Sequence, residues 1–220
     1  MTAGPTPRGG AGSRRLLVLL LAAFGLTGAG AAALLVTRSR AQPAELAADA
    51  PISGSSLYQL EAEWTTADAK PLRLRDLRGR PRVVSMIFTR CPSACPTLVK
   101  EMQALERKLP EAVRERTGFV LISIDPDHDT PEVLRAYGQK MGLDKDRWTL
   151  LRGSAEDVRE LAATLGFSYG KGEGADIAHS KLITVLNGRG EIVHQQLGVV
   201  NDPERLAAAV DAAERAPTGG

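Results

Sequence analysis

The feature that most restricts how this chain can fold is a run of 21 residues without charge, from Leu16 to Val36. At about 1.5 Å per residue, a helix of this length crosses a hydrocarbon layer of about 30 Å. Three arginines precede the run, and two follow it closely. This bias predicts a cytoplasmic N-terminus, one transmembrane helix and an exported remainder.

A cleavable signal peptide is the alternative interpretation of the same run. The small residues from Gly28 to Ala33, or the stretch from Ser39 to Ala41, could form a cleavage region. An uncleaved anchor is favoured, because a signal peptide core usually has only about 7 to 15 apolar residues. Both interpretations place the following domain in an extracytoplasmic space, the bacterial periplasm or the cell exterior.

The remaining length accommodates one ordinary domain, since domains cluster around 100 to 150 residues. We predict a cytoplasmic tail at 1–15, a transmembrane anchor at 16–36, a linker at 37–56, a domain at 57–214 and a flexible tail at 215–220. A net charge of +2 does not suggest nucleic-acid binding. The arginines are also scattered, with no basic run interleaved with aromatic residues.

Strands and helices are expected to alternate along the domain. Strand patterns occur at 57–65, 72–74, 82–89, 119–124, 148–151, 181–186 and 191–196. Helix patterns occur at 96–109, 130–141 and 154–165, and from Asp202 onward with Pro203 first. The strands at 57–65 and 72–74 predict a hairpin at the edge of the domain, and NGRG predicts a second hairpin between the last two strands. This order indicates an α/β domain with a mixed central sheet flanked by helices.

The chain has two cysteines, Cys91 and Cys95, in the segment CPSACP. Two cysteines cannot form a disulfide framework, so they indicate a reactive or metal-binding pair. Cys91 is expected in the turn after a buried strand, and Cys95 at or beside the N-cap of a helix. Because free N–H groups there favour negative charge, we expect at least one thiol to ionise more readily than a free cysteine. The alternative is that both pack as small hydrophobic side chains.

A third ligand would come from one of three histidines. His128 lies in a turn entering a helix and His194 within a strand, where solvent or packing accounts for each. His179 ends the flexible stretch GKGEGADIAHS directly before the strand at 181–186. A loop can bring it to a site made by distant residues. The alternative for His179 is a hydrogen bond to its own chain.

Two thiolates and one imidazole form a soft ligand set. Such a set favours copper, Cu(I) in particular, over magnesium or calcium. Zinc remains an alternative, although structural zinc takes four protein ligands and the sequence offers no clear fourth. The residue types therefore predict a copper site, and they leave open whether the ion is Cu(I) or Cu(II).

Three segments resemble the Sco (SenC) family of copper chaperones, which are membrane-anchored thioredoxin-fold proteins that help assemble cytochrome c oxidase. The segments are DLRGRPRVVSMIFTRCPSACP, ISIDPDHDTPE and DIAHSKLITVLNGRGEIV, in the family's order. The resemblance covers about Leu57 to Glu214. It implies a thioredoxin-like fold, copper ligands at Cys91, Cys95 and His179, and transfer to the copper-bearing subunit of cytochrome c oxidase or to another acceptor.

Asp125 matches the family's Asp-Pro after the second buried strand. The resemblance implies that Asp125 tunes the copper site by charge or hydrogen bonding. An equally weighted alternative is that it only forms the turn and caps it.

Two enzymatic functions are alternatives to a metallochaperone. A thiol-disulfide reductase would use Cys91 and Cys95 as a redox-active pair to keep an acceptor's cysteines reduced. Against this, Ala178 and Ser180 flank His179 where thioredoxins carry a cis-proline. A peroxidase is less consistent, because Cys91 lacks the Pro-x-x-x-Thr/Ser-x-x-Cys arrangement of peroxidatic sites.

Overall fold

A computed structural model describes residues 55–171, 177–198, 200 and 202–215. The predicted cytoplasmic tail, membrane anchor and nearly all of the linker lie outside these residues. Among the residues that are described, no helix has both the length and the apolar character needed to cross a bilayer.

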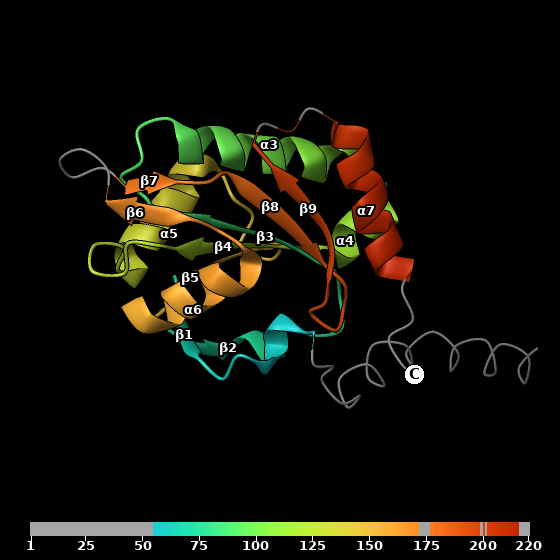
Figure 1. Ribbon diagram of the computed structural model, residues 1–220. Coiled ribbons are helices and arrows are strands. Elements are labelled where there is room, and N and C mark those ends of the chain that lie inside the picture. The colour runs from blue at the N-terminus through green and yellow to red at the C-terminus, as the bar shows by residue number, and fades with distance from the viewer. Residues whose placement is uncertain (1–54, 172–176, 199, 201, 216–220) are drawn as a thin grey trace, which may run out of the picture. The chain divides into compact units, whose positions relative to one another are not determined.

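A mixed seven-stranded sheet forms the centre of the domain (Figure 1). Its strand order is β2-β1-β5-β4-β3-β8-β9. The strands are β1 (Glu63–Thr66), β2 (Pro71–Arg73), β3 (Arg82–Ile87), β4 (Gly118–Ser123), β5 (Trp148–Arg152), β8 (Leu182–Leu186) and β9 (Ile192–Leu197). Strands β3, β4 and β5 are parallel, whereas β1 and β8 run antiparallel to the strands beside them.

The central strands β3 and β4 are buried along their whole length. Their sequences, RVVSMI and GFVLIS, have no strict polar alternation, as expected for parallel strands covered on both faces. The sequence-based prediction of these two strands is confirmed, and so is the mixed sheet.

Helices cover both faces of the sheet. They are α3 (Ala94–Lys108), α4 (Glu111–Arg116), α5 (Pro131–Met141), α6 (Ala155–Leu165) and α7 (Pro203–Arg215). On one face, α3 contacts α7 and also α5, where Gln103 Nε2 donates to the Met141 carbonyl over 2.9 Å. Helix α6 lies on the other face (Figure 1). The short helix α4 was not expected from the sequence.

Helices α5 and α6 begin where their capping residues predicted. The Thr130 hydroxyl accepts a hydrogen bond from the Val133 N–H, and the Ser154 hydroxyl accepts one from the Asp157 N–H. Asp157 also completes a capping box with Ser154. These contacts confirm the predicted starts of both helices.

The predicted hairpin at the domain edge is confirmed, because β1 pairs antiparallel with β2, the outermost strand. The predicted strand over 57–65 is only partly correct. Residues Leu57–Gln59 form the 3₁₀ helix η1, capped by Ser56, and only Glu63–Thr66 are extended in the sheet. A second 3₁₀ helix, η2, occupies Leu74–Leu77.

Two differences from the sequence-based expectation lie next to the cysteines. Helix α3 begins at Ala94 rather than Pro96, so Cys95 lies inside the first turn. His179 ends a short strand, β7 (Ile177–His179), instead of a free loop. Strand β7 pairs antiparallel with β6 (Tyr169–Lys171), and His179 lies opposite Tyr169.

Candidate metal centre

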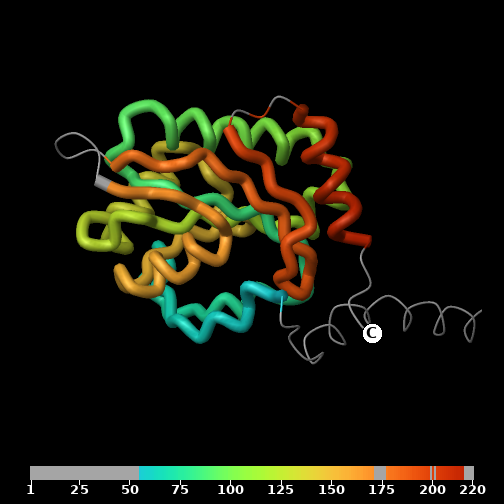
Figure 2. The backbone as a smooth tube through the Cα atoms, viewed as in Figure 1, coloured from blue at the N-terminus to red at the C-terminus, as the bar shows by residue number. Residues whose placement is uncertain are grey.

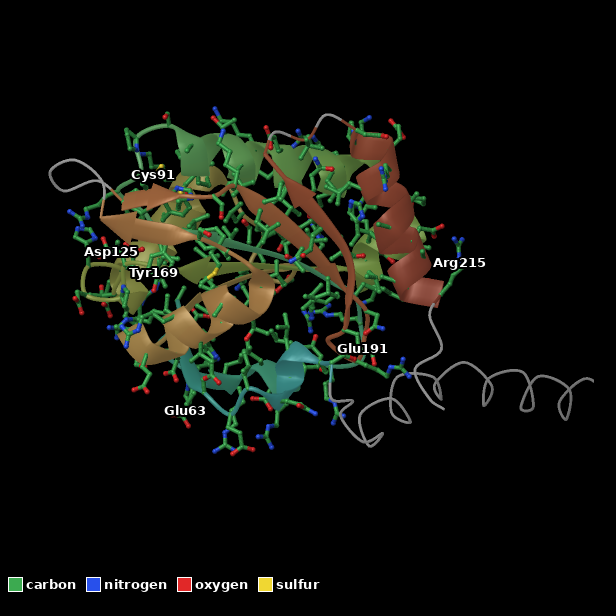
Figure 3. The ribbon with its side chains drawn as sticks, in the orientation of Figure 1. Glu63, Cys91, Asp125, Tyr169, Glu191 and Arg215 are labelled. Carbon is green, nitrogen blue, oxygen red and sulfur yellow. The ribbon has the colours of Figure 1, made fainter. Side chains whose placement is uncertain are left out.

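The two cysteines lie at the end of the domain where the parallel strands finish. Cys91 follows β3 and precedes α3, while Asp125 follows the neighbouring strand β4. Figure 3 shows both residues at this end, with Glu191 at the opposite end. In open α/β sheets, sites commonly form beyond the carboxyl ends of the strands. The β6–β7 pair runs past the start of α3 at the same end (Figure 2).

A tight turn and a helix start bring the two sulfurs together. The Cys91 N–H donates to the Phe88 carbonyl over 3.2 Å, which closes a four-residue turn. The N–H of Cys95 donates to Cys91 Sγ, also over 3.2 Å. Ser93 occupies the N-cap position of α3, but its side chain makes no capping bond. The sulfur of Cys91 therefore satisfies one of the free N–H groups of the first helical turn.

His179 completes the group with a defined ring orientation. Its Nε2 lies 3.5 Å from Cys95 Sγ, and its Nδ1 lies 2.8 Å from the carbonyl oxygen of Ser180. A carbonyl only accepts, so the neutral ring carries its proton on Nδ1. The lone pair of Nε2 then points toward the cysteines. A hydrogen bond at one ring nitrogen is the usual way to orient a metal-binding histidine.

Two phenylalanines hold the imidazole between them. The Phe88 ring meets the His179 ring edge-on, at 5.6 Å between centroids and 87° between planes. The Phe167 ring stacks on His179 at 5.9 Å and 20°. Since both phenylalanines are buried, the imidazole has little freedom to rotate away from the sulfurs.

Burial outweighs the helix terminus in setting the protonation of Cys95. Its side chain is fully buried, and loss of solvent raises the pKa of the thiol well above its ordinary value. For Cys95, the expectation of a more readily ionised thiol is therefore wrong. A metal ion that binds this sulfur must displace a proton.

The three predicted ligand residues lie together. One ligand atom from each of Cys91, Cys95 and His179 lies within 4.8 Å of the others. Both cysteines are free thiols. Two sulfurs and one imidazole nitrogen at this spacing could converge on a single soft ion with little rearrangement.

Asp125 lies beside this group rather than in it. Its Oδ2 accepts from Arg90 Nη2 over 2.6 Å and from Arg90 Nε over 3.2 Å. Because Arg90 directly precedes Cys91, the carboxylate meets the cysteine turn through that side chain. His194 is on β9, opposite Val185.

The fold and this group of side chains define a class of protein, a thioredoxin-like α/β domain with a Cys-Cys-His group at the start of a helix. The SCO1/SenC family model matches residues 54–214, which is most of the chain. The chain therefore belongs to the SCO1/SenC family.

Relatives and solved structures agree with this membership. The SCO1 protein homolog of Bacillus subtilis is 29% identical over 150 residues, covering 66% of this chain and 77% of that protein. A SCO1/SenC family lipoprotein from Bacillus anthracis has 28% identity and a TM-score of 0.63, covering 69% of this chain and 91% of its own. Arabidopsis thaliana ScoI, solved with copper bound, has 23% identity and a TM-score of 0.61, and the match covers 75% of this chain and 99% of that chain. This similarity supports the fold. Matches span from 24% to 77% of the curated relatives' own lengths.

Three residues of the site were not expected from the sequence. Phe88 and Phe167 belong to apolar stretches that look like ordinary core, and nothing local marks them as neighbours of a histidine. Asp129 lies in the segment DPDHDTPE, where it is one of three acidic residues before the helix-starting Thr-Pro. Its complete burial is visible only in the folded domain.

Proposed function

We propose that this protein is a copper metallochaperone that holds copper through Cys91, Cys95 and His179. It passes the ion to the dinuclear copper centre of cytochrome c oxidase. The observation that carries the proposal is the spacing of the three ligand atoms, all within 4.8 Å of one another on the fold of the SCO1/SenC family. Copper bound in structures of Arabidopsis and yeast relatives supports the choice of ion.

A site with three protein ligands suits a protein that transfers copper better than a protein that stores it. Copper held by two sulfurs and one nitrogen can accept a further ligand, so an acceptor's thiolates or imidazoles can bind before the first ligands leave. The backbone N–H of Cys95 and the carbonyl of Ser180 support two of the three ligands without occupying the lone pair of Nε2. The site therefore exists before copper arrives.

We infer that the domain works while tethered to a membrane, facing the periplasm or the cell exterior. The support is the uncharged run at 16–36, followed by a linker at 37–56 and the domain at 57–214. Alkaline extraction of membranes from cells that produce the full-length chain tests the anchor. The protein should remain in the membrane fraction and retain its N-terminal residues by mass spectrometry.

Copper stoichiometry of the purified full-length protein tests the ligand assignment. The wild-type protein should bind about one copper ion per chain, and alanine at Cys91, Cys95 or His179 should weaken binding by several orders of magnitude, as expected when one of three ligands is lost. His194→Ala is the matched control, because that imidazole is outside the group. Unchanged binding in all three ligand variants would refute the proposal.

A thiol-disulfide reductase is the second candidate function, because two free thiols lie side by side. Burial raises the pKa of Cys95, so this thiol is a poor attacking group and exchange would have to start from Cys91. The two functions separate in His179→Ala, which should lose copper delivery and keep disulfide exchange. Oxidation of the pair would also expel copper, which would link the two activities.

A further inference from the structure

A second group of possible metal ligands lies next to the cysteine site. One ligand atom from each of Asp125, His128 and Asp129 lies within 4.8 Å of the others. Asp129 is fully buried, unlike the other two side chains. The contacts of its carboxylate decide whether this group could bind an ion.

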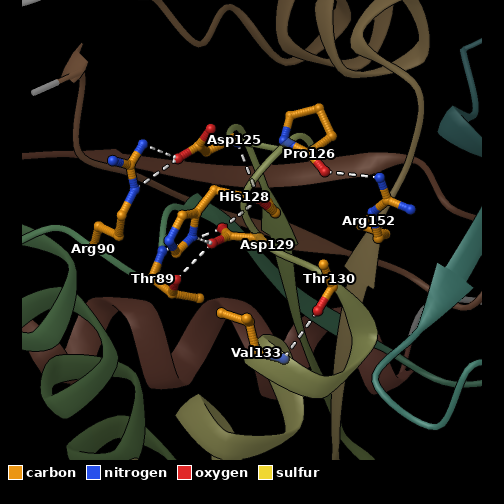
Figure 4. A network of polar contacts seen from close by, with 10 residues as sticks. Thr89, Arg90, Asp125, Pro126, His128, Asp129, Thr130, Val133 and Arg152 are labelled. Atoms are coloured by element: carbon orange, nitrogen blue, oxygen red, sulfur yellow. Dashed lines mark hydrogen bonds and ion pairs between the residues drawn. The ribbon is translucent and has the colours of Figure 1, made fainter. Parts of the chain in front are cut away.

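Four protein donors surround the carboxylate of Asp129 (Figure 4). The Thr89 N–H and the Ser123 hydroxyl donate to Oδ2 over 3.2 and 2.5 Å. The Thr89 hydroxyl donates to Oδ1 over 2.5 Å, and His128 Nδ1 lies 3.3 Å from the same oxygen. A carboxylate offers about four lone-pair sites. All four are in use, so this carboxylate holds the protein together instead of holding a metal.

Asp129 acts on the turn that carries Cys91. The turn from Phe88 to Cys91 closes through one backbone hydrogen bond, and Thr89 is its second residue. Asp129 binds both the N–H and the hydroxyl of Thr89, so it fixes the turn by two charge-assisted bonds. The bond from Ser123 ties the same carboxylate to the end of β4, which is a rigid part of the sheet.

The neighbouring ion pair has a weaker hold on the turn. Arg90 binds Asp125, but its side chain is 42% exposed, and exposed pairs contribute little. The bonds of Asp129 are buried, where a charged acceptor interacts strongly with its donors. Of the two aspartates that reach the turn, Asp129 therefore controls its position.

We infer that Asp129 is a positioning residue for the copper site. Its buried carboxylate fixes the turn from Phe88 to Cys91 and so sets where Cys91 Sγ lies relative to Cys95 and His179. The inference rests on the proposed function, although the geometry of the two thiols can also be measured without copper.

Substitution of Thr89 and Asp129 in the full-length protein tests the inference. Asp129→Asn keeps the shape and loses the charge, whereas Thr89→Val removes only one donor. Thr89→Ser keeps the hydroxyl and should therefore behave like the wild type. Thr117→Val is the matched control, because its hydroxyl is equally hydrogen-bonded, to the Val113 carbonyl, and lies away from the cysteines.

Two quantities are measured besides the melting temperature. One is copper affinity by competition with a chelator, together with the sulfur-to-copper charge-transfer absorption. The other is the copper-free equilibrium with glutathione, in which the two thiols give two electrons and two protons to oxidised glutathione. The products are the Cys91–Cys95 disulfide and two molecules of reduced glutathione. The second quantity depends on sulfur geometry and needs no metal.

Asp129→Asn should weaken copper binding by about 10- to 100-fold, the usual effect of losing a partner that orients a metal ligand. Thr89→Val should weaken it by about tenfold, and both variants should shift the glutathione equilibrium and the absorption band. Lower melting temperature with unchanged affinity, absorption and glutathione equilibrium would overturn the inference. If Asp129→Asn does not fold, the same measurements on Thr89→Val, compared with those on the control Thr117→Val, test the inference. A wild-type protein that binds no copper would refute the proposed function, while the glutathione equilibrium would still test Asp129.

Discussion

The two ends of strand β3 each bury one charged residue, and they use it differently. At the start of the strand, its first residue Arg82 is 5% exposed, and Arg82 Nε donates to the Leu77 carbonyl over 2.9 Å. The hydroxyl of Tyr58 donates to the same carbonyl over 3.3 Å. At the other end, Asp129 accepts bonds from the turn that leads to Cys91. Arg82 therefore joins β3 to the end of η2, whereas Asp129 fixes the turn that leads to Cys91.

Packing around the two charges differs as well. At the Arg82 end, a Cβ built on Gly118 would lie 2.1 Å from Arg82 Nη1, and one built on Gly190 would lie 2.5 Å from Tyr58 Cδ2. Side chains therefore pack closely against both glycines at this end. At the cysteine end, the reactive groups contact one another: Cys91 Sγ accepts from the Cys95 N–H, and Nε2 of His179 lies 3.5 Å from Cys95 Sγ. The comparison teaches that one end of the sheet uses its buried charge for tight packing, whereas the other uses it to position groups that can bind a metal ion.

Gly190→Ala should give the largest effect and act on stability alone. The residue has a φ of +79°, and the added methyl would overlap the buried Tyr58 ring. We expect a loss of about 3 to 5 kcal/mol in the free energy of unfolding, measured in urea. Gly138→Ala is the control, because its added methyl makes only an ordinary contact of 3.6 Å. If copper affinity of the folded Gly190 variant fell as well, the two ends would not be independent.

Copper should stabilise the fold through the cysteine end. At a free concentration of about one hundred times the dissociation constant, binding adds about 2.7 kcal/mol to the free energy of unfolding. Thermal unfolding with and without copper measures this for the wild type and for Cys91→Ala. An equal gain in Cys91→Ala would place the binding elsewhere, such as at His128.

Replacing Phe167 by leucine should loosen the histidine at moderate cost. The stacked pair with His179 is lost, which removes about 1 kcal/mol of stability and speeds copper release. Stopped-flow transfer to a chelator measures the release rate. Phe119→Leu is the matched control, since Phe119 stacks on Trp148 at 4.7 Å within the core. Faster release in both variants would show that general loosening, and not the ring on His179, is responsible.

Arg90→Gln should give the smallest effect. The Arg90 side chain of the ion pair with Asp125 is exposed, so its loss should change the free energy of unfolding very little. Copper affinity is expected to stay near that of the wild type. A large loss of affinity, measured by chelator competition, would mean that Asp125 tunes the site through Arg90, as the family resemblance implies.

Local sequence predicted the parts of the fold that local interactions specify. The apolar runs of β3 and β4, the caps at Thr130 and Ser154, and the edge hairpin are each set by residues a few positions apart. The β6–β7 pair was missed, because its strands are three residues long and carry little apolar pattern. The start of α3 was misplaced because the sulfur of Cys91, and not the Ser93 side chain, meets the N–H of Cys95.

The sequence by itself determined which ligand atoms exist and in what order, namely two thiols with three residues between them and one imidazole far along the chain. Tertiary structure decided that Cys95 and His179 meet across 84 positions, that Nε2 carries the lone pair, and that burial raises the pKa of the Cys95 thiol. It also decided that Asp129 serves the turn and not a metal. The reason is physical: distance between remote side chains and loss of solvent depend on how the whole sheet packs, and no local pattern encodes either.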